Sequence, residues 1–518
     1  MQSAHSQKPK RLYDFRWRIR IDAVAMLVYV ILVYAWALSI YPLGRDYIAL
    51  AEKGANLPWI SGAAFHIEES VFGSWTVGYH LVNAVLLYGC MLCIYLLVNL
   101  SIKGPAWIGI FAANLFMANP LHSESVLNLS GVADLLPCLL ALAALTTYAW
   151  QVEKGKSGLL VLPFALVLLA ALPFRINAWL PALFLLYEGL LTGSHQRSKL
   201  RIALGLAALV ASLAIHAPAL LHAHYSLAAL FVPLYFTFYC IGFLPETAYR
   251  FHTSPWLAWA AVAAVIIAVL WVHRKVRRPA FAFAFLAMVL LRLSPDSRFI
   301  DPVHLIGGGQ LLVPQALLMF AVAAVYLRVM EHPKWRLPLV YSSFSVSIIF
   351  FIMEGVSIWH WREAASQVRA FQAQAQTIGG KGPIGVVPDY QSYAGAPMDL
   401  ATSISYDTPF GSAIPNRPVL PIHYFPPNVL HVTIETWAPA KTRILTEGKP
   451  LVDLGPYRFY VSDNNYIGLA ADHSADSPNR KITFTLEAGK KVFPDRYVTL
   501  KTTSTEPAAP GKEPEQEP

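Results

Sequence analysis

Long apolar runs alternate with short polar segments along the first two thirds of the chain. A helix needs about 20 apolar residues to cross the hydrocarbon core of a bilayer, with a range of about 17–25. Several runs are shorter than this, so we expect their helices to extend into flanking polar residues. The pattern predicts eleven membrane-spanning helices, near 22–42, 79–99, 105–118, 134–151, 158–173, 178–193, 202–221, 256–273, 279–293, 311–328 and 338–355.

A twelfth apolar run, 226–244, is assigned by the charges of the loops. Cytoplasmic loops carry an excess of Lys and Arg, and basic residues here fall on every second loop, with the strongest cluster at 273–278. That cluster is cytoplasmic only if 226–244 does not cross, and Pro233 and Pro245 fit a broken element that lines a protein cavity. We therefore predict a re-entrant or surface-lying segment there, with the N-terminus in the cytoplasm and the C-terminus outside.

The chain changes character near residue 358. An amphipathic helix is expected over 358–378, and short β-like runs separated by Pro and Gly follow it. The last residues are rich in Pro and Glu and are typical of a disordered tail. We expect a cytoplasmic N-terminus, a transmembrane domain, a small extracytoplasmic α/β or β-rich domain and a tail, at 1–21, 22–357, 358–502 and 503–518.

Composition narrows the class of protein. The chain of 518 residues is 56% hydrophobic and 14% charged, with a mean hydropathy of +0.46, whereas soluble domains are about 45–50% apolar and about 25% charged. This excludes a soluble enzyme for most of the chain. The net charge of +9 comes from basic residues at the ends of apolar runs, which argues against nucleic acid as a partner. The four cysteines lie in apolar segments and predict no disulfide framework or metal cage.

Candidate chemistry lies in the predicted outer loops, of which 43–78, 119–133 and 294–310 are long and polar. These loops carry acids, His and Arg without a basic excess, as expected of a site that faces the outer compartment. Arg45 and Asp46 follow the first predicted helix. Asp46 is a candidate general base for an acceptor hydroxyl, and the alternative is a solvated carboxylate that pairs with Arg45.

Two further loops add candidates. His122 and Glu124 are candidate catalytic residues or ordinary loop residues, and Asp134 is a candidate substrate contact or an anion in a first helical turn. His80 shares a helical face with Asn83, where structural hydrogen bonding is the alternative. In the last loop, a Gly-rich turn that opens a helix provides backbone N–H groups for a phosphate or is simply flexible; its candidates are Arg298, His304 and Gly307–Gly309.

The string NPLHSESVLNLSGVADLLPCLLALAALTTY at 119–148 resembles the second-loop signature of the GT-C superfamily, the membrane glycosyltransferases that use polyprenyl-phosphate sugars. The similarity is to the O-mannosyltransferases that carry transmembrane and tetratricopeptide-repeat regions. Weaker similarity at 79–89, 177–191 and 294–314 extends the resemblance over roughly 20–355. The residues that match the signature are Asn119, Pro120, His122, Glu124, Val126, Gly131, Asp134, Leu135 and Leu136.

The sequence departs from that family at several points. Asp46 stands alone where the family often has an acidic pair, and Val132 replaces the arginine of a Gly-Arg pair. The Lys-Glu position reads Arg175-Ile176-Asn177, three glycines replace Ala-Glu-Arg in the last loop, and the repeat array is absent. Arg175 and Arg298 are substitutes as phosphate contacts, because a guanidinium binds phosphate from more than one direction.

The resemblance implies an inverting transfer on the outer face of the membrane. A lipid-linked sugar would place its tail between helices, and Asp46 would take the proton from a hydroxyl of a protein or glycan acceptor. Arg175, Arg298 or His122 would stabilise the leaving phosphate. Some members of the superfamily need a divalent metal, for which Asp46, His122 and Glu124 are possible ligands, although no spacing here specifies a site.

Two other functions stay open. The missing arginine and acids favour a non-catalytic member of the fold that serves as a scaffold, with a protein partner bound through the C-terminal domain. A transporter or flippase is the third hypothesis. Transporters place polar sites near the bilayer midplane, and we expect no charged residue deep inside a span. In every case the expected location is a bacterial inner membrane with a periplasmic C-terminal domain.

Overall fold

The computed structural model describes most of the helical part of the chain and the strands near its C-terminus. It divides the chain into two units, which are Met1–Ile40 with Glu52–Arg362, and Tyr41–Ala51 with Glu363–Pro518. The described residues are 10–102, 104–119, 122–155, 161–194, 196–221, 278–292, 308–375, 384–387, 392–393, 396–398, 400–410, 419–421, 431–437, 441–446, 449–453, 458–461, 467–470, 480–492 and 495–507.

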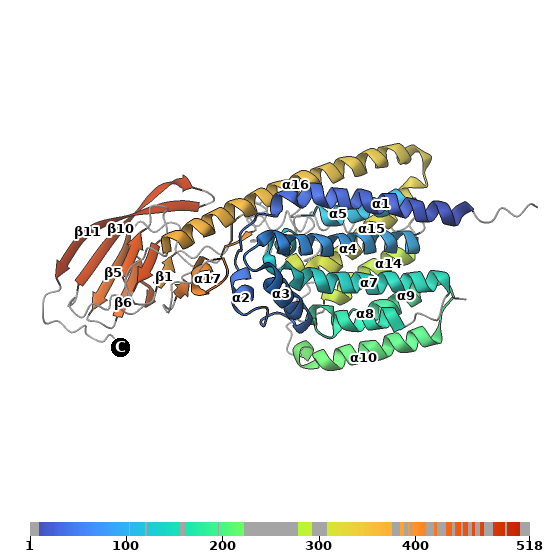
Figure 1. The fold of residues 1–518 in the computed structure, drawn as a ribbon, viewed down its shortest axis with the longest axis horizontal. Helices are drawn as coiled ribbons and strands as arrows, with labels where there is room; N and C mark the ends of the chain where they lie inside the picture. The colour runs from blue at the N-terminus through green and yellow to red at the C-terminus, as the bar shows by residue number, and fades with distance from the viewer. Residues whose placement is uncertain are drawn as a thin grey trace, which may run out of the picture. The chain divides into compact units, whose positions relative to one another are not determined.

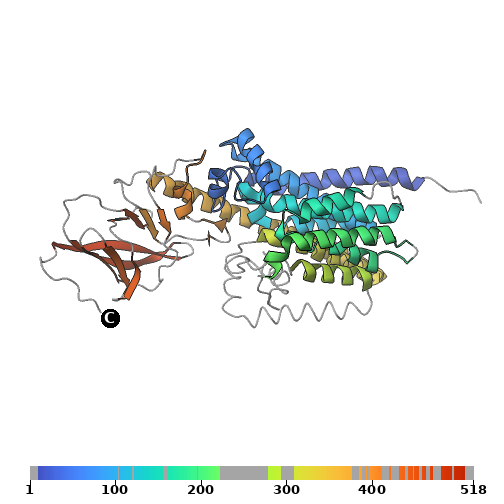
Figure 2. The same ribbon diagram turned by 90° about the horizontal axis from the view of Figure 1, so that it is seen from below.

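The first unit is a set of helices that lie side by side (Figure 1, Figure 2). Its long helices are α1 (Lys10–Tyr34), α4 (Thr76–Ile102), α7 (Val132–Lys154), α10 (Lys199–Leu221), α15 (Leu312–Met330) and α16 (Pro333–Ala375), the last of which continues into the second unit. The shorter elements are η1 (Ala35–Ala37), α3 (Trp59–Phe72), α5 (Ala106–Met117), α6 (Ser123–Leu127), η3 (Leu129–Gly131), α8 (Val161–Ala171), η4 (Arg175–Asn177), α9 (Ala182–Leu190), α14 (Arg278–Arg292) and η6 (Gly308–Leu311).

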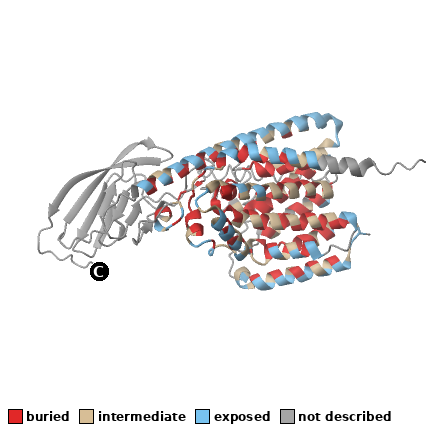
Figure 3. Cartoon of the chain, in the orientation of Figure 1, coloured by how far each residue is buried: buried red, intermediate tan, exposed pale blue. Residues whose placement is uncertain are grey.

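Helices α4, α7 and α15 form the interior of this unit, while α10 and α16 expose much of their length (Figure 3). Exposed side chains on these outer helices are large and apolar, such as Val210 at 66% and Phe344 at 68%. Such surfaces are favourable in lipid rather than in water. Within the described residues, six helices are long and apolar enough to cross a membrane. The chain is therefore a multi-pass helical membrane protein.

The helices follow the apolar runs, with differences at their ends. The predicted segment 226–244, the run 256–273 and most of the cluster 273–278 lie outside the described residues, so the count of eleven spans stays a prediction. The predicted span 338–355 and the predicted amphipathic helix 358–378 belong to one continuous helix, α16, which the structure describes as far as Ala375. The predicted loop 43–78 contains helix α3, whose buried face includes Phe65.

The second unit joins a short early segment to the C-terminal part of the chain. Its helices are α2 (Asp46–Ala51), the end of α16 and α17 (Leu400–Ser405). Its strands are β1 (Ile384–Val387), β2 (Ser392–Tyr393), β3 (Ala396–Pro397), β4 (Val419–Pro421), β5 (His431–Trp437), β6 (Lys441–Thr446), β7 (Lys449–Asp453), β8 (Arg458–Val461), β9 (Ile467–Ala470), β10 (Arg480–Val492) and β11 (Asp495–Pro507).

The described strands form three sheets. One is mixed, with the order β4-β1-β9-β8, in which β1 pairs with β4 in parallel and with β9 antiparallel. The second is antiparallel, with the order β11-β10-β5-β6-β7, and is built on the long β10–β11 hairpin. The third is the short pair β2-β3. The hairpins of the second sheet keep sequence neighbours adjacent, so most of its pairing is local.

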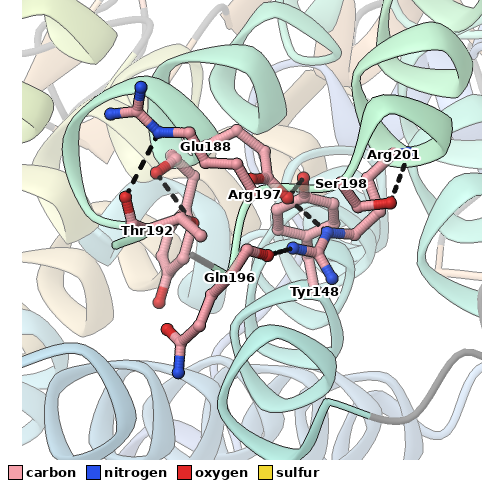
Figure 4. A network of polar contacts seen from close by, with 8 residues as sticks. Tyr148, Glu188, Thr192, Gln196, Arg197, Ser198 and Arg201 are labelled. Atoms are coloured by element: carbon pink, nitrogen blue, oxygen red, sulfur yellow. Dashed lines mark hydrogen bonds and ion pairs between the residues drawn. The ribbon is translucent and has the colours of Figure 1, made fainter. Parts of the chain in front are cut away.

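A buried ion pair fixes the turn between α9 and α10 (Figure 4). Arg201 Nε donates to Glu188 Oε1, and the Tyr148 hydroxyl donates to the same carboxylate at 2.9 Å. Arg201 also donates to the Gln196 carbonyl, and Glu188 is 1% exposed. Burying two charges is costly unless each finds partners. This set of contacts therefore couples three helices.

We expect Arg201→Met to destabilise the protein strongly. Removing one partner of a buried ion pair leaves the other charge uncompensated, which costs about 3–5 kcal/mol in comparable cases. Thermal unfolding of the purified protein in detergent measures the loss. The matched control is Arg197→Gln, because Arg197 is exposed and donates to the backbone oxygens of Gly189 and Thr192. Equal melting of both variants would contradict the assignment.

Candidate functional site

The segment between α5 and α7 folds into a compact turn, which we call the α6 loop (residues 122–131). Asn83 on α4 supports it, because its side-chain amide donates to the carbonyls of Val126 at 3.3 Å and Asn128 at 2.7 Å. A Cβ atom at Gly131 would overlap the Ser125 carbonyl oxygen and approach Asn83 Nδ2 at 2.7 Å. Glycine at this position is thus required for the close approach of the backbone.

His122 is fully buried at the start of the α6 loop. Its Nε2 lies 2.6 Å from Gln315 Oε1 on α15, and its ring packs on Phe116 with centroids 4.3 Å apart. Because an amide oxygen only accepts, Nε2 carries the proton. Burial lowers the pKa of His122 to about 4. The ring is therefore neutral at pH 7 and donates a hydrogen bond rather than a positive charge.

Ser123 connects the α6 loop to α16. Its hydroxyl donates to Glu354 Oε2 at 3.0 Å and lies 2.7 Å from the Ser357 hydroxyl. The Tyr34 hydroxyl also lies against the Glu354 carboxyl, which is 0% exposed. Glu354 lies at the end of the predicted span 338–355 and not near its middle, so the expectation of no charged residue deep inside a span stays a prediction. Glu354 is an acid at the end of an apolar run, which is itself a signal of a functional residue.

Asp134 lies in the first turn of α7, as predicted for an anion near a helix N-terminus. The Ser125 hydroxyl donates to Asp134 Oδ2 at 3.2 Å. A Cβ atom at Gly309 would overlap the Asp134 carboxyl and approach Ser125 Oγ at 2.7 Å. The glycine turn that opens α15 therefore lies directly against this pair, and the described part of that turn begins at Gly308.

The remaining candidates of the first unit lie on α4, α6 and η4 or outside the described residues. Glu124 is buried within α6, at 6% exposure. His80 Nε2 lies 3.2 Å from the Ile40 carbonyl, in agreement with structural hydrogen bonding. Arg175 is exposed in η4, the turn between α8 and α9. Arg298 and His304 lie outside the described residues.

Arg45 and Asp46 belong to the second unit. Asp46 opens α2, accepts the Leu43 N–H on Oδ2 at 3.2 Å, and donates its own N–H to the Leu43 carbonyl at 3.0 Å. Its exposure is 1%, so the alternative of a solvated loop carboxylate is wrong. Arg45 is half-buried.

Two further observations bear on the chemistry. Among the described residues, no group of three or more His, Cys, Asp or Glu side chains is arranged to hold a metal ion. Glu68, on the buried face of α3, was not a candidate from the sequence, and burial raises its pKa to about 8. Its position inside a stretch interpreted as a polar loop concealed it, because the helix there was not predicted.

The burial of His122 predicts a dependence of stability on pH. The native pKa of about 4 lies below the ordinary value of 6.5, so between these values the unfolded chain binds the proton and the native protein does not. The free energy of unfolding should therefore fall by about 3 kcal/mol from this group as the pH drops from 7 to 4. His122→Gln keeps a polar group and should reduce that loss in thermal unfolding in detergent.

The control for this measurement is His66→Gln, since His66 is exposed on α3. That variant should retain the wild-type dependence on pH. An unchanged pH dependence in His122→Gln would show that the ring is not the group that resists protonation.

Comparisons with known proteins give limited similarity. No family model matches the sequence. A stretch of 126 residues is 31% identical to the protein O-mannosyl-transferase Tmtc1 of Drosophila melanogaster and covers 24% of this chain. The chain thus spans only 14% of the length of that relative.

One solved structure is similar over a larger part of the chain. It is ArnT from Cupriavidus metallidurans, bound to undecaprenyl phosphate, with 15% identity and a TM-score of 0.41 over 74% of this chain and 84% of that one. The superfamily resemblance predicted from the sequence agrees with the relative found through sequence comparison. This chain resembles the GT-C membrane glycosyltransferases.

Proposed function

We propose that this protein is an inverting glycosyltransferase that moves a sugar from a polyprenyl phosphate to an acceptor at the outer face of the membrane. The observation that carries the proposal is the α6 loop. Residues 122–131 of the string that resembles the family signature form a buried turn, in which Ser123, Ser125 and His122 each contact a polar partner on another helix or turn. Buried polar groups in a membrane protein are costly and mark functional sites.

Asp46 is the proposed base. Its carboxylate takes the proton of the acceptor hydroxyl, and the hydroxyl oxygen then attacks the anomeric carbon of the sugar. The bond between that carbon and the phosphate oxygen breaks, and the electron pair leaves with the polyprenyl phosphate. A carboxylate is suited to this step because the reaction needs a proton acceptor and no other covalent chemistry. The fixed turn at Leu43 supports the role, since a base must be held in place.

The other candidates would bind the donor. Arg45, Arg175 and Arg298 are the proposed contacts of the phosphate, because Arg forms paired hydrogen bonds to phosphate oxygens. His122, as a neutral donor, and Glu124 would shape the site, and no step is assigned to a metal. Sugar and acceptor contacts are proposed for His80, Asp134 and His304. The re-entrant segment 226–244 would form part of the groove for the lipid.

The topology that accompanies this function is the one the loop charges indicate. The N-terminus would lie in the cytoplasm, and the C-terminal domain would lie outside, in the periplasm if the membrane is a bacterial inner membrane. The acceptor is then a protein or glycan of that compartment. Mannose is the first sugar to test, because the relative found through sequence comparison is a protein O-mannosyl-transferase.

A scaffold without activity is the second candidate, and one observation favours it. Asp134, Glu354 and His122 already have partners within the chain, at Ser125, Ser123 and Gln315. A polar loop satisfied in this way is also what a structural element requires. The carboxyls would then fix the fold, and the second unit would bind a protein of a membrane complex.

We expect Asp46→Asn to abolish turnover while donor binding is retained. The amide keeps an oxygen that accepts the Leu43 N–H but cannot take up the acceptor proton, so the loss should be at least about 100-fold. The purified protein in nanodiscs is incubated with a polyprenyl-phosphate mannose and an extract of periplasmic proteins. Consumption of the donor and its binding, the latter by native mass spectrometry, are measured separately.

The matched control is Glu52→Gln. Glu52 is an exposed carboxylate six residues after Asp46, and its replacement should leave turnover unchanged. Turnover retained in Asp46→Asn would defeat the role of the base. Folded wild-type protein that neither binds nor consumes a panel of lipid-linked sugars would instead favour the scaffold.

A further inference from the structure

The segment that carries Asp46 groups with the C-terminal part of the chain. We call residues 41–51 the Asp46 segment, and the structure places it in the second unit together with residues 363–518. Tyr41 begins the segment, and its hydroxyl donates to the carbonyl of Phe410. The two rings also meet edge to face, with centroids 5.7 Å apart. A residue far along the sequence therefore fixes the start of this segment.

Arg369 holds the same tyrosine from another side. Its guanidinium carbon lies 5.7 Å from the centroid of the Tyr41 ring. A cation over the face of an aromatic ring is attracted by the ring quadrupole. Arg369 is exposed at the end of α16 and Tyr41 is half-buried. The contact thus joins α16 to the Asp46 segment through an interaction that needs both the charge and the ring.

A second connection lies one residue after Asp46. Tyr47 is fully buried, and its pKa is raised well above the usual value by burial and by the neighbouring Tyr41 and Asp46, while the nearby Gln372 side chain acts the other way. The Gln372 amide also donates to the Ser403 carbonyl of α17 at 2.7 Å. Gln372 comes three residues after Arg369, so both are reached from one side of the helix.

The end of α16 is amphipathic and packs within the second unit. The buried positions follow helical spacing, while intervening residues such as Ser366 and Arg369 are exposed. The apolar side therefore anchors the helix and leaves the Arg369 head free to reach Tyr41. The buried residues of this stripe are Ala364, Ala365, Val368, Phe371 and Gln372.

We propose that Arg369, acting through Tyr41, is a positioning residue that holds Asp46 in its reactive place. The C-terminal part of the chain would then belong to the catalytic machinery and would not be a mere appendage. This inference rests on the proposed function, because it assigns the purpose of the contact to proton transfer at Asp46. A misplacement of about 1 Å in such a group costs on the order of 100-fold in rate.

Hydrogen exchange of the full-length protein tests the contact without any need for activity. Peptides that cover the Asp46 segment report the amides of Asp46 and Ala49, which donate to the carbonyls of Leu43 and Arg45. Arg369→Gln should raise their exchange about two- to fivefold, the size expected for an exposed cation–π contact. It should also lower kcat by at least that factor and leave KM for the donor unchanged.

Two variants act as controls, one at Arg369 itself and one at Arg362. Arg369→Lys keeps a cation and should restore much of the protection and of kcat. Arg362→Gln removes an exposed arginine two turns earlier on α16 and should change neither. Restoration by lysine distinguishes the cation–π contact from a loss of side-chain packing.

The second test is coupling between the two side chains. In a Tyr41→Leu background, Arg369→Gln should have no further effect, whereas in Tyr41→Phe, which keeps the ring, its effect should persist. Exchange that is unchanged in Arg369→Gln overturns the inference, and so does faster exchange with an unchanged kcat. If the wild type consumes no donor but exchange responds as expected, the proposed function fails and the contact itself is still real.

Discussion

The cost of burying polar groups in a helix bundle governs the arrangement of this protein. Moving a polar group from water into an apolar medium without a hydrogen bond costs several kcal/mol of free energy. Each buried polar group on the α6 loop therefore needs a hydrogen-bond partner. The Asn83 amide donates to two loop carbonyls, the Ser123 hydroxyl donates to Glu354, and His122 forms a hydrogen bond with Gln315. These partners lie on α4, α16 and α15. The loop therefore keeps its shape only while the helices around it keep theirs.

The same constraint explains which parts of the fold were predictable from the sequence. Apolar runs predicted α4, α7, α10 and α15 because a span in lipid must be apolar and helical along its whole length. Helix α3 was missed because its buried face alternates with exposed His66 and Ser70, which looks like a polar loop. The sequence predicted two segments for helix α16, because its composition changes near residue 358. The backbone hydrogen bonds of a helix continue across such a change in composition, so the helix is one element.

The candidate site was predictable in part for a related reason. Residue types placed His122 and Asp134 in one loop, and helical turns brought Asp134 beside Ser125. Glu354 and Gln315 could not be assigned to the loop, since their contacts join residues separated by 231 and 193 positions. Periodicity carries no information on such pairs. The same holds for Tyr41 and Arg369, which no local pattern connects.

The missing arginine of the family signature bears directly on the choice between enzyme and scaffold. Val132 stands in its place and is 2% exposed at the start of α7. An arginine at a site packed in this way would bury a guanidinium without water, which is costly unless a phosphate or carboxylate pairs with it. The packing around Val132 thus disfavours an arginine at this position of the chain. A phosphate contact, where one exists, has to come from another element, and Arg175 is exposed in the neighbouring turn where Asn177 donates to the Pro137 carbonyl of α7. An active enzyme therefore requires an arginine outside the α6 loop to bind the phosphate, for which Arg45, Arg175 and Arg298 are the proposed residues, whereas a scaffold requires none.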